Sequence, residues 1–381
     1  MGLEEIRGEI DRVDDELARL FSRRMALAAR VAQEKRDRGG PVLRAGREEA
    51  IVSRLLRQAE PELVVPLRQF CATLFRLSRA HQQLLLEGPP PLAAEIAQAL
   101  ADTPETFPDA ATAACQGIEG AYSQIACNQL FENPKILYVR TFDAVFRAVE
   151  QGLCRYGVLP IENSSFGSVT QVYDLMKKHH CRIVRGLRLR VDHCLLSRAG
   201  SAAKVREIFS HEQALGQCSD FLRSLGDVKI TVCENTAVAA QLAAEAGRED
   251  AAALSSEECA ALYGLRILRR KVQNADNNET RFICISRRTE LYPGANRCSM
   301  MLTLRHQPGS LVSMLDLPAS QGVNLTKLES RPVLGKEFEF LFYFDLDADA
   351  TRPETMELLC RMAAQAEEFT FLGSYLERTT E

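Results

Sequence analysis

Apolar residues recur in steps of mostly four and three along the first 31 positions, at Ile6, Ile10, Val13, Leu17, Leu20, Leu27 and Val31. This spacing places them on one face of a helix, and no proline interrupts the stretch before residue 41. A helix of about 35 residues would be roughly 50 Å long, too long for a small monomer. We therefore expect its apolar seam to meet another subunit. Two more helical stretches, near 47–59 and 66–86, complete a predicted helical domain over residues 1–87.

The pattern changes after this domain. Residues 88–112 are rich in Ala and Pro, which predicts a linker with room for one short helix. From about residue 113 onward, helical stretches alternate with short strand-like runs at 136–139, 156–161, 181–184, 229–233 and 281–286. This alternation predicts an α/β domain over residues 113–290 with mostly parallel strands.

Residues 296–381 show a third pattern. Strand-like runs are expected at 298–306, 324–330, 338–346 and 369–376, with helices at 310–321 and 352–367. Their order is that of a βαββαβ unit, a small fold that commonly binds ligands and dimerises. The expected fold class is therefore multidomain: an all-α dimerising domain, an α/β domain and a C-terminal α+β domain.

Composition narrows the function. The 381 residues are 46% hydrophobic and 26% charged, with a net charge of −4, which fits a folded protein and argues against a nucleic-acid or membrane-surface partner. The 12 cysteines are scattered without a C-x-x-C pair, which argues against a zinc ribbon or a thioredoxin-type redox site. The N-terminal segment lacks the apolar core of a signal peptide, and no apolar run is long enough to span a membrane. We expect a cytoplasmic enzyme with reduced thiols.

The helical seam contains two cations. Arg24 occupies the seam position between Leu20 and Leu27, and Lys35 follows Val31 on the same face. A guanidinium inside a helix bundle is unfavourable unless it is paired. The pattern fits a structural ion pair or a side chain that reaches solvent, and it also fits an anion-binding pocket.

Small polar residues mark three expected strand-to-helix junctions in the α/β domain. They lie at 117–123, 160–168 and 234–236, and helix N-termini with such residues can bind anions. Each is also an ordinary N-cap, but three together predict a carboxylate-binding cleft. A fourth polar segment, 278–282, is expected as a turn just before a strand.

The helical domain resembles the all-helical chorismate mutases. The matching motifs are I-R-x-x-I-x-x-x-D (6–14), R-R-M-x-L-A (23–28), Lys35, P-V-x-x-x-x-R-E (41–48) and S-R-A-H-Q (78–82). The resemblance implies a dimer with pockets built from both chains. Arg44 departs from the family, which often has Asp there.

Roles in the helical domain follow from this resemblance alone. Arg24, together with Arg7 of the second chain, would bind the two carboxylates of chorismate. Lys35 and Gln82 would donate to the ether oxygen, while Glu48 would accept from the ring hydroxyl. Arg47 and Ser78 would support them. The rearrangement to prephenate is pericyclic, so it needs positioning and charge stabilisation rather than a nucleophile.

The α/β domain resembles prephenate dehydratases, on motifs that include G-x-x-G-A-Y-S, P-I-E-N-S-S-F-G-S and T-R-F. That family has two lobes, like a small periplasmic binding protein, with the active site between them. The resemblance implies that no metal and no cofactor are needed. The resemblance implies that Thr280 donates a proton to the departing hydroxyl. It assigns substrate binding or orientation to Ser123, Asn163, Ser164, Thr236 and Arg281. Gln217 and His211 are further candidates, although a lone His is more often structural.

The C-terminal unit resembles the ACT regulatory domains attached to such dehydratases. Two motifs carry the resemblance, Gly309-Ser310-Leu311-Val312 and Glu329-Ser330-Arg331-Pro332. In that family they bind phenylalanine, so we expect feedback inhibition by this amino acid.

Together the three segments predict a bifunctional chorismate mutase–prephenate dehydratase that forms a homodimer or a higher homo-oligomer. Two alternatives stay open. One is a monofunctional dehydratase whose helical domain only dimerises, and the other is a non-catalytic ligand-binding sensor. The sequence also leaves open whether arogenate, the aminated analogue of prephenate, is accepted.

Overall fold

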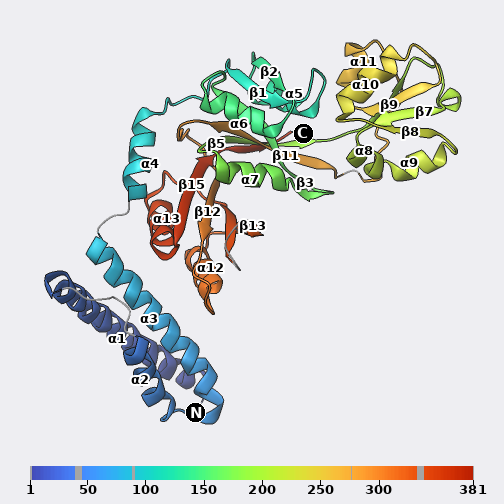
Figure 1. Ribbon diagram of the computed structural model, residues 1–381. Coiled ribbons are helices and arrows are strands. Elements are labelled where there is room, and N and C mark those ends of the chain that lie inside the picture. The colour runs from blue at the N-terminus through green and yellow to red at the C-terminus, as the bar shows by residue number, and fades with distance from the viewer. Residues whose placement is uncertain (1, 39–44, 88–90, 276, 333–338, 381) are drawn as a thin grey trace.

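The computed structural model describes residues 2–38, 45–87, 91–275, 277–332 and 339–380 (Figure 1). Its N-terminal part is a helical domain, which lies at the lower left of Figure 1. The elements are α1 (Leu3–Arg38), α2 (Ala45–Leu56), the short 3-10 helix η1 (Pro61–Leu63) and α3 (Val64–Glu87). The predicted long helix is therefore confirmed. No helix among the described residues has both the length and the apolar character needed to cross a membrane.

The apolar seam of α1 is largely uncovered in the single chain. Ile10, Val13 and Leu27 are each more than half exposed, at 53%, 57% and 51%. Exposing such a row of side chains to water is unfavourable, since each buried Leu, Ile or Val contributes about 1.5–3 kcal/mol.

The segment predicted as a linker contains a helix that belongs to a core. Helix α4 (Pro91–Asp102) buries Leu92, Ile96 and Ala99 in one cluster with the C-terminal domain. The expected short helix is present, but it is packed rather than free, because its apolar residues recur at helical spacing.

The α/β domain has two lobes, which lie at the top and right of Figure 1. The elements of lobe 1 are β1 (Thr112–Gln116), α5 (Tyr122–Leu130), β2 (Lys135–Val139), α6 (Phe142–Glu150), β3 (Tyr156–Asn163), β4 (Gly167–Ser168), α7 (Thr170–Lys178), β5 (Arg182–Arg190) and β11 (Glu279–Ser286). Its sheet has the order β16-β5-β11-β3-β1-β2, where β16 (Glu377–Thr379) comes from the C-terminal segment, and β4 pairs with β3.

Lobe 2 is inserted between β5 and β11. Its elements are β6 (Cys194–Ser197), η2 (Ala202–Lys204), β7 (Glu207–Ser210), α8 (Glu212–Gln217), α9 (Ser219–Ser224), β8 (Lys229–Val232), α10 (Thr236–Glu245), β9 (Ala251–Ser255), α11 (Glu258–Leu262) and β10 (Arg266–Arg269). The sheet order is β10-β6-β9-β7-β8.

The prediction of mostly parallel strands is confirmed, because β5, β3, β1 and β2 of lobe 1 share one direction and β10, β9, β7 and β8 of lobe 2 share another. Besides the two-residue β4, each lobe has one strand that runs against the others. Strand β11 runs antiparallel to both β3 and β5, and β6 runs antiparallel to β9 and β10. The reason is the insertion: the chain leaves lobe 1 after β5 and returns as β11, so the returning strand enters the sheet in the opposite direction.

The C-terminal domain has the expected βαββαβ order. Its elements are β12 (Arg297–Thr303), α12 (Ser310–Ser320), β13 (Leu325–Pro332), β14 (Phe340–Leu346), α13 (Pro353–Gln365) and β15 (Glu368–Tyr375). The sheet order is β13-β14-β12-β15, so β13 is an edge strand. The chain then continues as β16 (Glu377–Thr379), which pairs with β5 and so extends the sheet of lobe 1.

One glycine shows how closely the C-terminal domain meets lobe 1. Gly373 in β15 has a φ of +150°, and a Cβ atom there would lie 2.0 Å from the carbonyl oxygen of Ile183 in β5. Any other residue would have to push the two strands apart. The domain is therefore docked on lobe 1 by direct backbone approach as well as by β16.

Candidate active sites

The first candidate site lies between α1 and α3. Arg24 of α1 donates to the Ser78 hydroxyl and to the Leu74 carbonyl at 3.3 Å, both on α3. Its guanidinium also lies over the Phe75 ring, 5.3 Å from the centroid. Burial lowers the pKa of Arg24, while Glu48 opposes that shift, so the cation and this carboxylate are electrostatic neighbours.

A second pair lies further along the same two helices. Lys35 donates to Gln82 Oε1 at 3.2 Å, and Gln82 is only 8% exposed. Periodicity placed Arg24 and Lys35 on one face, and both do face α3 in the structure. Their partners Ser78 and Gln82 are four residues apart, which puts them one above the other on one face of α3.

Sequence reasoning gave no role to Arg79. Its guanidinium donates to both carboxylate oxygens of Glu48, at 2.6 and 2.5 Å. Arg79 lies inside the S-R-A-H-Q motif, next to Ser78, so its place beside assigned residues was the available signal. Glu48 of α2 is thereby held against α3.

Two assigned residues are not brought to this group within the chain. Arg7 pairs with Glu4 on the exposed surface of α1. It precedes Arg24 by 17 residues, roughly 25 Å along a helix, so only an Arg7 from another chain could reach Arg24. Arg47 is exposed on α2, and Arg44 lies outside the described residues.

The second candidate site centres on Thr280 and Asn163. These residues are directly opposite each other on the antiparallel strands β11 and β3, so their side chains share one face of the sheet. Asn163 Nδ2 donates to Thr280 Oγ1 at 2.9 Å. The segment predicted as a turn is thus the first part of strand β11, and strand pairing sets the position of Thr280.

The orientation of the Asn163 amide is fixed by its other partners. Its Oδ1 accepts from the backbone N–H groups of Ser165 and Phe166, at 3.0 and 3.1 Å. Its Nδ2 therefore has to point the other way, towards Thr280. Because Thr280 Oγ1 accepts this hydrogen bond, its own hydrogen remains available for another acceptor.

This geometry makes a prediction for Asn163→Asp. A carboxylate only accepts, so it would capture the Thr280 hydrogen instead of leaving it available. We expect dehydratase kcat to fall on the order of 10²-fold, the size of a general-acid contribution. Steady-state kinetics on prephenate would measure this, with Ser165→Ala as control because Asn163 uses only the backbone of Ser165. Unchanged kcat in Asn163→Asp would contradict the orientation.

A hydrogen-bonded chain continues from Asn163 across the junction of the two lobes. Asn163 Nδ2 also donates to Asn278 Oδ1 at 3.0 Å, and Asn278 exchanges two amide hydrogen bonds with Gln217 of lobe 2, at 3.0 and 3.1 Å. Gln217 Oε1 accepts from His193 Nε2 at 2.8 Å. The Tyr122 hydroxyl lies 3.4 Å from His193 Nδ1. Gln217, a further candidate from sequence, is thus part of the group.

Three residues of this hydrogen-bonded network were given no role from the sequence. Asn278 is 2% exposed and His193 is 2% exposed, and burial lowers the pKa of His193. Tyr122 donates to the Asp192 carbonyl at 2.7 Å. Tyr122 lies in the G-x-x-G-A-Y-S motif and Asn278 begins the polar segment 278–282, but only the fold shows that these residues and His193 meet where the lobes join.

Three other residues assigned to substrate binding, Ser123, Ser164 and Thr236, have different surroundings. Ser123 and Thr236 are buried at the beginnings of α5 and α10, whose neighbours Ala121 and Ala237 pack in one cluster. Ser164 accepts from the Glu279 amide and donates to the Asn277 carbonyl.

The three junctions are not alike. Asn235 caps α10 through its side chain, whereas α5 has no side-chain cap. Asn163 and Ser164 end a strand and begin a turn into β4, well before α7 starts, so the expectation of a helix N-terminus there is wrong. His211 caps α8 by accepting from the Gln213 amide, which is the ordinary structural role.

Arg281 does not join Thr280, and this corrects its expected placement at the substrate. Successive side chains on a strand point to opposite faces, so Arg281 lies behind Thr280. It is 7% exposed and donates to Asp345 at 2.5 Å, to the Tyr375 hydroxyl at 2.9 Å and to Glu377. Burial alone would lower the pKa of Arg281, but these three neighbours outweigh it and raise that pKa.

The two C-terminal motifs lie on different elements. Gly309, with a φ of +85°, directly precedes Ser310 and α12, and Val312 is 62% exposed. In β13, Glu329 accepts from Ser168 of lobe 1 at 2.7 Å, and Arg331 pairs with Asp174 at 3.0 Å. On the opposite side of the strand, Leu328, Ser330 and Pro332 are exposed.

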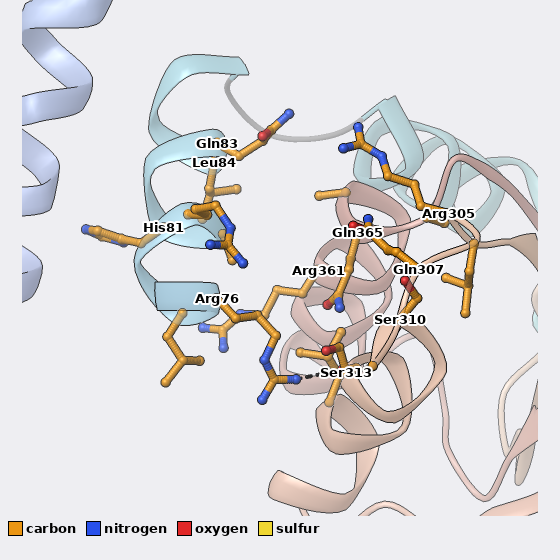
Figure 2. Close-up of a pocket in the computed structure, with 18 of the residues that line it drawn as sticks. Arg76, His81, Gln83, Leu84, Arg305, Gln307, Ser310, Ser313, Arg361 and Gln365 are labelled. Carbon is orange, nitrogen blue, oxygen red and sulfur yellow. Dashed lines mark hydrogen bonds between the residues drawn. The ribbon is translucent and has the colours of Figure 1, made fainter. Parts of the chain in front are cut away.

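A cavity of about 790 Å³ separates α3 from the C-terminal domain (Figure 2). Arg76 of α3 crosses it, donating to the Ser313 carbonyl and to Asp316, both at 2.9 Å. Ser310 lines the same cavity. The helix that carries Ser78 and Gln82 is therefore tied to the first turns of α12.

Comparison with known proteins follows the same division. The chain matches the family models chorismate mutase type II over residues 6–83 and prephenate dehydratase over residues 113–290. It is 38% identical over 280 residues to arogenate dehydratase/prephenate dehydratase 2, chloroplastic, of Arabidopsis thaliana, covering 70% of this chain and 73% of that protein. A solved prephenate dehydratase from Arthrobacter aurescens, in complex with L-Phe, is 28% identical with a TM-score of 0.64, covering 70% of this chain and 89% of that one.

One similarity spans both matched regions. The bifunctional chorismate mutase/prephenate dehydratase of Escherichia coli (strain K12) is 30% identical over 383 residues, covering 97% of this chain and 95% of that protein. The match runs through the helical domain, both lobes and the C-terminal domain. The chain belongs to the family of bifunctional chorismate mutase/prephenate dehydratases.

Proposed function

We propose that the chain rearranges chorismate to prephenate in its helical domain and converts prephenate to phenylpyruvate between its two lobes. In the first step Arg24 would leave Ser78 to bind a substrate carboxylate, and Lys35 and Gln82 would donate to the ether oxygen. The pairs Arg24–Ser78 and Lys35–Gln82 support this, because they hold the proposed donors in place between α1 and α3.

The second step needs one proton donor. The C–O bond to the ring hydroxyl and the C–C bond to the ring carboxylate break together, giving water, carbon dioxide and an aromatic ring. The Thr280 hydroxyl donates to the departing oxygen and regains a proton from solvent, so one proton is consumed in total. The observation that carries this proposal is the Asn163 amide donating to Thr280 Oγ1, which leaves the Thr280 hydrogen for the substrate.

The test is an end-point assay at neutral pH. The protein is incubated with chorismate, with prephenate or with arogenate, and each product is quantified by chromatography. Phenylpyruvate from chorismate supports both activities. If prephenate is converted but chorismate is not, the helical domain only dimerises and the protein is a monofunctional dehydratase. If none of the three substrates reacts, the alternative of a non-catalytic ligand-binding sensor is favoured. Phenylalanine formed from arogenate would show acceptance of the aminated substrate.

We also propose a dimer. The uncovered seam of α1 supports a helical interface in which each chain lends Arg7 to the site of the other. The exposed side of the edge strand β13, together with exposed Val312 on α12, supports a second contact between two C-terminal ACT domains. Phenylalanine would bind there, between the two motifs of facing domains, and inhibit turnover.

A substitution on β13 tests the regulatory part. Leu328 is 42% exposed on the edge strand, so Leu328→Asp should spare the fold of the monomer but place charge in the proposed interface. We expect phenylalanine to raise the Tm of the wild type and suppress its dehydratase, and both effects to be lost in Leu328→Asp. Ile230→Asp is the matched control, because Ile230 is 40% exposed on the edge strand of lobe 2. Full inhibition of Leu328→Asp would contradict the interface.

A further inference from the structure

On the back of the catalytic strand, the partners of Arg281 within hydrogen-bonding distance come from the C-terminal segment, and Glu162 of lobe 1 lies further away, at 4.0 Å. Arg281 directs its three nitrogen groups to Asp345 of β14, to Tyr375 of β15 and to Glu377 of β16. None of these partners comes from either lobe's own sequence. A buried guanidinium with this many specific partners is well fixed, since loss of a partner would leave a charge unpaired in the interior.

The partners are themselves fixed. Ser299 of β12 donates to Asp345 at 2.5 Å and lies 2.8 Å from the Tyr375 hydroxyl. Glu377 also pairs with Arg188 and Arg297, at 3.0 and 3.3 Å. The Arg281 group is therefore part of a network that includes β12, β14, β15 and β16.

Strand β3, which pairs with β11, is also held by side chains of the C-terminal domain. Glu162 lies opposite Arg281 on β3, one position before Asn163, and accepts from Lys327 of β13 at 2.8 Å. Lys327 also donates to Ser168, whose hydroxyl donates to Glu329. Both residues of the Thr280–Asn163 pair thus have a chain neighbour whose side chain is anchored in the C-terminal domain.

We propose that Arg281 is a positioning residue: through Asp345 and Glu377 it lets the C-terminal domain set the position of Thr280, and it does not contact the substrate. This rests on the proposed role of Thr280 as donor. A peptide unit is rigid, so a shift of the Arg281 backbone moves Thr280 with it. A displacement of about 1 Å is enough to lower a rate on the order of 10²-fold. A movement of β13 or β14 would therefore displace Thr280 through the protein itself, with no contact to the substrate.

The test uses the full-length protein with Arg281→Lys, Asp345→Asn, the double variant and Arg188→Lys. Lys keeps the charge but cannot make the three-way contact, and Asn keeps the shape of Asp without its charge. Arg188 also contacts Glu377, but it is 42% exposed and lies on β5, so Arg188→Lys is the matched control. Dehydratase kcat and KM are measured on prephenate, mutase activity is measured on chorismate, and thermal unfolding reports whether each variant is folded.

We expect Arg281→Lys and Asp345→Asn each to lower dehydratase kcat on the order of tenfold or more while KM stays within about twofold. The double variant should be no slower than the slower single variant, because both remove one interaction. Arg188→Lys and all mutase rates should match the wild type. If Arg281→Lys does not fold, Tyr375→Phe removes one hydrogen bond from the same group and should lower kcat in the same direction.

Three results would overturn the proposal. A raised KM with unchanged kcat in Arg281→Lys would mean that Arg281 binds substrate. Unchanged kcat in Asp345→Asn would remove the C-terminal domain from the mechanism. Additive losses in the double variant would mean that the two residues act separately. Failure of the donor assignment is seen independently, as full activity in a Thr280→Val variant.

Discussion

Replacing Thr280 by Val is expected to abolish the dehydratase while leaving the mutase intact. Valine has the shape of threonine without the hydroxyl, so the strand and its packing are preserved and only the donor is lost. We expect dehydratase kcat to fall on the order of 10³-fold or more, the upper range for loss of a positioned proton donor. The Asn163 amide would also lose its acceptor on Thr280, which adds to the loss. Steady-state rates on prephenate and on chorismate would measure both activities.

Thr280→Ser is the matched control. It keeps the hydroxyl but removes the methyl group that restricts the χ1 angle, so it should retain a reduced but measurable rate. A Thr280→Val enzyme within about tenfold of the wild type would exclude Thr280 as the donor, whatever the rate of Thr280→Ser.

Replacing Lys35 by Ala is expected to have the opposite effect to Thr280→Val: the mutase activity should be lost and the dehydratase activity should be normal. Lys35 is held by Gln82 and is one of the two proposed donors, and the rearrangement depends on stabilising charge at the ether oxygen. Loss of one preorganised donor should lower mutase kcat on the order of 10²–10³-fold. The absorbance of chorismate during turnover gives the rate directly.

Arg36→Ala is the control for this variant. Arg36 is the next residue on α1 and donates to the Leu85 carbonyl of α3, so it bridges the same two helices, but it is exposed. Its removal should leave mutase kcat unchanged. Equal losses in Lys35→Ala and Arg36→Ala would mean that the site depends on helix docking rather than on the ammonium group.

The sequence was most informative where one hydrophobic period runs through a whole helix or strand. Seven apolar residues at helical spacing were enough to predict α1 and the unusual position of Arg24 in its seam. The βαββαβ order of the C-terminal domain was predicted equally well, because each of its strands and helices shows the hydrophobic period of its own type. In both cases the information is local in the chain.

The sequence was least informative where distant segments meet. Strand direction in the lobes depends on where the chain re-enters a sheet, and no local pattern records that. His193, Asn278 and Gln217 become one network only because the two crossings between the lobes lie side by side.

Arg281 shows a different limit. Its place in the T-R-F motif predicted a substrate contact, yet strand alternation turns it towards Asp345 and Glu377. A motif match identifies residues that are expected to be functional, but it does not state to which face of a strand each side chain points. Had the segment been recognised as strand rather than turn, alternation alone would have separated Arg281 from Thr280.

The central claim is that one chain performs two successive reactions at two separate sites. The most direct test mixes the Lys35→Ala and Thr280→Val proteins and supplies chorismate at neutral pH. We predict that Thr280→Val alone accumulates prephenate, that Lys35→Ala alone leaves chorismate largely unchanged, and that the mixture forms phenylpyruvate. Phenylpyruvate from Thr280→Val alone, or none from a mixture in which each variant keeps its other activity, would contradict this account.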